Sequence, residues 1–144
     1  MQVETNMDSC LTKKTDHKIL LPDGWPAPRG YSHAIAASGR LLVLGGQIGI
    51  TPQGDMRDGF VAQCEQALQN ICCLLETAGA MPEHLVRMTW FVTDIAVYNA
   101  SLRPLGAVYR QTMGRHYPVM SLVQVGRLVE PGAVVEIEAT AVIP

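Results

Sequence analysis

The sequence predicts an α+β fold in which two helices cover one face of a single mixed sheet. Apolar side chains recur at helical spacing over residues 60–78, and residues 95–113 form a second helical segment. Short β-rich runs lie before, between and after these two segments. The order is therefore strand, strand, helix, strand, helix, strand, strand. No repeat, low-complexity stretch or internal linker interrupts it, so we expect one domain over residues 17–144.

The first strands lie on either side of a run that is rich in proline and glycine. Residues 17–21 predict a short edge strand ahead of that run. Residues 31–37 predict a second strand, which a turn at Ser38 and Gly39 connects to a hairpin partner at residues 40–48.

The predicted helices carry their own stop and start signals. Gly79 follows the first helix, where a left-handed residue closes the last turn. Residues 84–93 are the next β-rich run. Pro104 would break the interior of the second helix, so we place it in the first turn of the main helix, after a short preliminary turn. Two strands complete the chain.

The last strand alternates between two kinds of side chain. One face is fully apolar and suited to packing under the helices: Val135, Ile137, Ala139, Ala141 and Ile143. The other face mixes valines with two carboxylates: Val134, Glu136, Glu138, Thr140 and Val142. The valines indicate partial burial, and a carboxylate in such a place must be hydrogen-bonded or paired.

Composition argues for an assembly of subunits and against nucleic-acid binding. Hydrophobic residues make up 48% of the chain and charged residues 17%, which indicates apolar surface buried between subunits. The net charge is −2, and no cluster of lysine and arginine stands out in the domain. Nucleic acid is therefore a disfavoured partner.

The cysteines and histidines show no metal or disulfide pattern. The four cysteines lack the spacing of a disulfide framework or a zinc knuckle, which predicts a reduced, cytoplasmic protein: Cys10, Cys64, Cys72 and Cys73. His33, His84 and His116 lie apart, so no metal site is expected. Residues 1–16 are expected to form a flexible N-terminal arm, which shows neither a signal peptide nor a membrane span.

Several short pieces occur in a defined order along the chain. They are Tyr31, Gly45-Gly46-Gln47-Ile48, Gln63 with Ala67-Leu68-Gln69-Asn70, Leu85-Val86-Arg87-Met88-Thr89, Val92-Thr93-Asp94, Val108-Tyr109, Tyr117-Pro118 and Val135-Glu136-Ile137-Glu138-Ala139. Together they resemble the YjgF/Rid family of reactive-intermediate (enamine/imine) deaminases, over roughly residues 25–142. The resemblance implies a chorismate-mutase-like fold, a homotrimer with a central barrel, and cofactor-free sites in clefts between subunits.

One position departs from what the resemblance implies. In the deaminase branch an arginine directly before the serine of the penultimate strand holds the substrate carboxylate, whereas here Met120 precedes Ser121. Leu122 stands in place of the family's cysteine, and Gly106 is aligned with its helix asparagine. Met120 is either an apolar filler or the mark of a pocket reshaped for a larger or less anionic ligand. The departure argues against 2-aminoacrylate as the substrate.

The remaining site residues follow from the same resemblance. Glu136 would position or activate the hydrolytic water, since a partly buried carboxylate can exchange a proton near neutrality. The alternative is that Glu136 lines the central barrel and pairs with an arginine of the next subunit. Tyr31 would wall in the ligand, and Gly46 would form the pocket floor with a backbone donor. Arg115 and His116 are the candidates to replace the missing arginine in anion binding.

Two functions remain open. The first is a cofactor-free hydrolase that releases ammonia from a small enamine or imine, such as an aminomuconate-like intermediate, at a cleft between subunits. The second is a trimer that binds a small metabolite, or regulates a partner, without turnover. Some members of the family are described as ribonucleases or translation inhibitors, a role that the acidic charge balance disfavours.

Overall fold

The structure, a computed structural model, describes residues 15–144 and has a four-stranded mixed sheet at its centre. The order across the sheet is β3 (Arg40–Ile48), β6 (Val135–Ile143), β4 (Leu85–Val92) and β5 (Val119–Gln124). β4 and β5 are parallel, while β6 is antiparallel to both of its neighbours. This confirms the α+β class and the mixed sheet. Most of the predicted arm lies outside the described residues.

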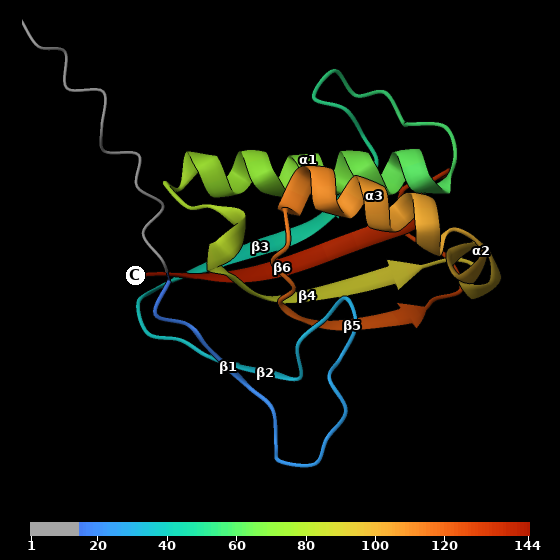
Figure 1. Cartoon of the computed structure of the whole chain (residues 1–144). Helices are drawn as coiled ribbons and strands as arrows, with labels where there is room; N and C mark the ends of the chain where they lie inside the picture. Colours follow the sequence, from blue (N-terminus) through green and yellow to red (C-terminus); the bar gives the residue numbers. More distant parts are fainter. Residues whose placement is uncertain (1–14) are drawn as a thin grey trace, which may run out of the picture.

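Two helices cover one face of the sheet, α1 (Phe60–Thr77) and α3 (Leu102–Met113) (Figure 1). A short helix, α2 (Ile95–Ala100), precedes α3, and a single 3₁₀ turn, η1 (Pro82–His84), precedes β4. Gly79 has φ of 73° just after α1, and Pro104 lies in the first turn of α3, so both predictions are confirmed. No helix within residues 15–144 is long and apolar enough to cross a membrane.

The predicted pairing of the first strands is wrong. β2 (Ala34–Ala36) pairs with β1 (Lys18–Leu20) in a separate two-stranded sheet, which lies on the side away from the helices (Figure 1). β3 pairs instead with β6, from Arg40 opposite Ile143 onward. Gly39 packs so closely on the Ile143 carbonyl that no side chain fits there, and the chain therefore turns into β3 beside the end of β6. The described strands thus form two sheets rather than one.

The two faces of the main sheet differ as the alternation of the last strand predicts. Its odd residues lie under the helices, where Val135, Ile137 and Ala141 are fully buried. The opposite face, called the outer face below, carries Glu136 and Glu138 from the same strand. Large apolar side chains also lie on the outer face and remain exposed within one chain: Leu41 at 64%, Val43 at 70% and Val123 at 45%.

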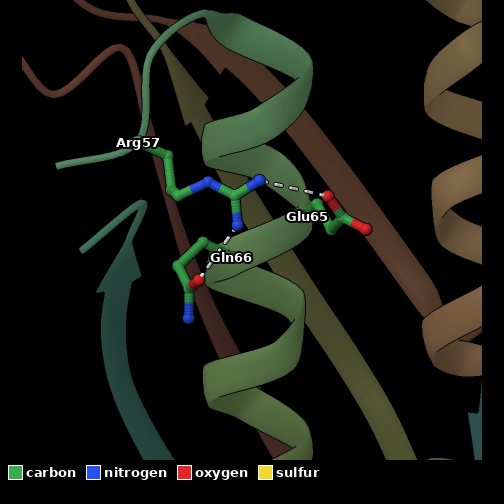
Figure 2. A network of polar contacts seen from close by, with 3 residues as sticks. All are labelled: Arg57, Glu65 and Gln66. Atoms are coloured by element: carbon green, nitrogen blue, oxygen red, sulfur yellow. Dashed lines mark hydrogen bonds and ion pairs between the residues drawn. The ribbon is translucent and has the colours of Figure 1, made fainter. Parts of the chain in front are cut away.

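A polar network ties the loop that follows β3 to helix α1. The Arg57 guanidinium lies 3.6 Å from the Glu65 carboxylate and donates to Gln66 Oε1 at 3.4 Å (Figure 2). Gln66 donates to Asn70 Oδ1, and Asn70 donates to the carbonyls of Ile48 and Ile50 at the end of β3. The network fixes the end of β3, which runs beside Glu136.

Gln63 makes a second set of contacts that is buried. It is 4% exposed, donates to the carbonyls of Arg57 and Gly132, and accepts from the amide of Val134. A Gln63→Ala variant leaves these main-chain groups without partners, and we expect it to lower the free energy of unfolding by about 2–4 kcal/mol. Urea denaturation measures this, with the exposed Gln69→Ala on the same helix as control. A loss below about 0.5 kcal/mol would contradict the structural role of Gln63.

Candidate functional site

A cavity of about 500 Å³ lies between helices α2 and α3, strands β4 and β5, and the segment just before β2. It is open to solvent on one side of the single chain. Its lining is mostly aromatic and aliphatic, with two arginines: Arg29, Gly30, Tyr31, Trp90, Tyr98, Leu102, Leu105, Gly106, Tyr109, Arg110, Tyr117, Met120 and Leu122.

The cavity floor is formed by the helix-facing side chains of two parallel strands. Met120 pairs with Met88 of β4, and Leu122 pairs with Trp90, so these side chains share one face of the sheet. Met120 and Leu122 are half-buried and pack against the hydrophobic core. Trp90 is 4% exposed, and its indole N–H has no acceptor among residues 15–144. The thioether of Met120 and the isobutyl group of Leu122 offer no hydrogen-bond donor to an anion. Residues that bind a charged ligand must therefore lie on the walls of the cavity.

Tyrosines form one wall. The rings of Tyr109 and Tyr117 stack with their centroids 5.4 Å apart and an interplanar angle of 11°. Burial, together with the neighbouring Tyr117, raises the pKa of Tyr109, and its hydroxyl donates to the His116 carbonyl at 2.6 Å. Burial also raises the pKa of Tyr98. These hydroxyls therefore stay protonated at neutral pH and serve as donors or packing groups rather than as bases.

Ser32 brings the segment before β2 to the cavity. Its amide and hydroxyl donate to the carbonyls of Pro118 and Tyr117, at 3.1 and 2.6 Å. The side chain is 5% exposed, and an isolated bridge joins it to Val119 at the start of β5. This attachment places the preceding residues, Tyr31 and Arg29, on the cavity wall. Tyr31 therefore lines this cavity together with Met120.

Two guanidinium groups line the cavity, from Arg29 and Arg110. The ion pair found among residues 15–144 joins Arg57 to Glu65, so neither lining arginine is neutralised within that part of the chain. Both were missed in the sequence, where an exposed arginine on a helix or in a loop attracts no notice. The sequence does contain one indication for Arg110. Gly106, an unfavourable residue for the interior of a helix, lies four residues earlier and therefore on the same helix face.

Glu136 and Gly46 lie together, but on the outer face of the sheet. Glu136 is half-buried and pairs with Phe91 and Ile48 in the neighbouring strands. A register shift in β3 between Leu44 and Gln47 brings Gly46 against it, and a methyl group at Gly46 would overlap the Glu136 carboxylate. This contact between two of the candidate site residues was not predicted from the sequence. Glu136 and Met120 cannot meet one ligand within a single chain, because the sheet separates them.

The other candidate residues lie away from the cavity. Ser121 alternates with Met120 and is exposed on the outer face, opposite Thr89. Arg115 is exposed and is not part of the cavity lining. His116 is half-buried, with Nε2 2.7 Å from the Leu85 carbonyl, so its ring is engaged by the main chain. Within one chain, Arg110 and Arg29 occupy the position that was expected of Arg115 and His116.

Two of the cysteines in the described chain, Cys64 and Cys72, are packing groups, while Cys73 is exposed. Burial raises the pKa of Cys64 to about 12. Burial, followed by the adjacent Cys73, raises the pKa of Cys72, whose thiol donates to the Thr112 carbonyl at 3.4 Å. Neither is an activated nucleophile. Residues 15–144 contain no group of three or more histidine, cysteine or acidic side chains that could hold a metal ion.

Comparison with known proteins decides the family. Residues 25–143 match the sequence profile of the family described as Endoribonuclease L-PSP. A solved structure from Yersinia pestis, described as a member of the Rid protein family, superposes with a TM-score of 0.79 at 30% identity, covering 90% of this chain and 100% of that one. This chain belongs to the YjgF/Rid family.

Relatives with curated names agree with this membership. A RutC family protein of Pasteurella multocida is 31% identical over 126 residues, which cover 87% of this YjgF/Rid chain and 97% of the relative. The human protein named 2-iminobutanoate/2-iminopropanoate deaminase is 32% identical over 114 residues, 78% of this chain and 79% of the human one. The resemblance stated from the sequence motifs is therefore confirmed.

Proposed function

We propose that this protein hydrolyses a small imine or enamine, releasing ammonia and a carbonyl product without a cofactor. The observation that carries the proposal is the contact between Gly46 and the half-buried Glu136 in a YjgF/Rid chain. A glycine at this point lets the carboxylate lie directly against the backbone of β3, where any side chain would displace it. The deaminase name of the human relative supports the same reaction class.

The proposed working form is a homotrimer whose outer sheet faces line a central barrel. The exposed Leu41 and Val43 support it, because side chains this apolar on a sheet face gain stability when a second subunit covers them. In such an assembly the cavity of one subunit would be completed by Gly46 and Glu136 of an adjoining one. In this arrangement Met120 of one subunit and Glu136 of the next would lie in one site, although the sheet separates them within a single chain.

The chemistry needs few groups. Glu136 would accept a proton from water as the water oxygen bonds to the imine carbon. Glu136 then gives this proton to the nitrogen, which forms a carbinolamine. The hydroxyl proton of the carbinolamine passes to the same nitrogen, the carbon–nitrogen bond breaks, and ammonia leaves as the carbonyl forms. The largely apolar cavity would hold the substrate and limit competing access of water.

An ammonia-release panel tests the proposal, with imines generated in situ by an amino-acid oxidase. A Glu136→Gln variant keeps the size of the side chain but cannot take the proton, and we expect its rate to fall by about 10²–10⁴-fold. Glu138→Gln is the matched control, two residues along the same strand and face, and should stay near wild type. Ammonia release by Glu136→Gln at the wild-type rate would contradict this mechanism.

The second candidate is a trimer that binds a small metabolite without turnover. Met120 favours it, because the substrate-holding arginine that the family resemblance implies is absent from the cavity floor. Saturable binding of keto acids, with no ammonia released from any substrate of the panel, would select this function over the first.

A further inference from the structure

We infer that Arg110 is the anion-binding residue of this cavity, and that the ligand is a carboxylate with an aromatic or similarly bulky apolar body. This inference rests on the proposed function, since it names the substrate class for the same site. The anion-binding residue would then lie on the helix α3, whereas the family resemblance implies an arginine on the strand β5.

The conformation of Arg110 supports this assignment. Its side chain folds back along α3, so that Nη1 comes within 3.3 Å of the position that a Cβ on Gly106 would occupy. Both residues line the cavity. No hydrogen bond or ion pair within residues 15–144 engages this guanidinium, which leaves its donors available to a carboxylate.

Gly106 lies directly beneath the folded-back side chain of Arg110. A glycine in the interior of a helix is less stable than alanine, because it loses more backbone freedom on folding. At this position it keeps open the space that the Arg110 guanidinium occupies at the cavity wall. An alanine would give a better helix, but Nη1 of Arg110 would have to shift by a few tenths of an ångström.

The rest of the cavity indicates the body of the ligand. Trp90, Met120 and Leu122 form an apolar floor, and the Tyr109–Tyr117 stack forms an aromatic wall. Such surfaces bind flat apolar groups but offer few hydrogen-bond partners to a small polar group. A cavity of about 500 Å³ is also much larger than a three-carbon imine requires.

Calorimetric titration of the full chain tests the inference with three probes: phenylpyruvate, pyruvate and the neutral 4-phenyl-2-butanone. We expect phenylpyruvate to bind more tightly than either of the others, because it alone carries both the carboxylate and the ring. In Arg110→Ala its affinity should fall by about tenfold or more, while the affinity for the ketone stays unchanged. Arg103→Ala is the matched control, an exposed arginine of α3 outside the cavity lining.

A second variant separates ligand binding from folding. Gly106→Ala should bind phenylpyruvate several-fold more weakly, because the guanidinium is displaced, and yet show an equal or higher Tm. A variant that fails to fold would lower both quantities together.

The outcomes separate this inference from the proposed function. Undiminished phenylpyruvate affinity in Arg110→Ala, or wild-type binding of pyruvate as tight as that of phenylpyruvate, overturns the inference and leaves imine hydrolysis standing. Wild-type turnover in Glu136→Gln overturns the hydrolytic mechanism, while Arg110-dependent binding of phenylpyruvate would still support the anion site.

Discussion

Replacing Gly46 by alanine is expected to lower imine hydrolysis by about 10²-fold or more, with Tm close to that of wild type. The added methyl group would overlap the carboxylate and the adjoining carbons of the Glu136 side chain. Because this is the far end of a flexible chain, it can rotate away at little cost in stability. A catalytic carboxylate displaced by about 1 Å loses about this much rate, since proton transfer depends on close placement.

The neighbouring glycine provides the control. Gly45 has no atom within 4 Å of the position of a Cβ, so Gly45→Ala adds the same group to the same strand without touching Glu136. Its turnover should match wild type. Equal rates in both variants would show that the placement of Glu136 does not limit the reaction.

Two inactive variants are expected to restore activity to each other when they are refolded together. Glu136→Gln leaves the cavity intact, whereas Met120→Asp places a carboxylate on the cavity floor and repels an anionic substrate. If each site joins the cavity of one subunit to Glu136 of the next, random trimers from a 1:1 mixture regain about a quarter of wild-type activity. Circular dichroism of each variant before mixing establishes that it folds.

A second mixture makes the test specific to the arrangement of subunits. Glu136→Gln and Gly46→Ala alter the same half of the proposed site, so their mixture should stay inactive. Recovery in neither mixture, with both variants folded and trimeric, would mean that cavity and carboxylate do not cooperate across subunits.

The parts of the fold that follow a strong local period were predictable. Alternation along 135–143 assigned each side chain of β6 to its face, because a strand buried on one side tolerates no slip of register. Gly79 and Pro104 marked helix ends for equally local reasons. Gly79 adopts the left-handed backbone that ends a helix, and Pro104 lacks the backbone N–H that the helix interior requires.

Pairing between distant segments was not predictable in the same way. The turn at Ser38 and Gly39 suggested a local hairpin, but β3 gains a longer partner in β6, nearly a hundred residues away. The placement of the site residues within one chain was hard to predict for a related reason. The sequence assigned Met120 and Glu136 to one cleft between subunits, but only the sheet register shows that they lie on opposite faces of a single chain. Arg110 lines the cavity through a side chain that folds back over Gly106, which depends on the tertiary arrangement.

The cavity and Glu136 lie on opposite faces of one sheet, and this affects how substitutions in the cavity lining act on the carboxylate. The residues of α3 and β5 that line the cavity are not among the atoms against Gly46, which all belong to Glu136. Free-energy changes at positions without shared partners add nearly independently. Under the proposed function, substitutions in the cavity lining would therefore change the choice of ligand, while the Gly46–Glu136 contact that positions the carboxylate stays in place.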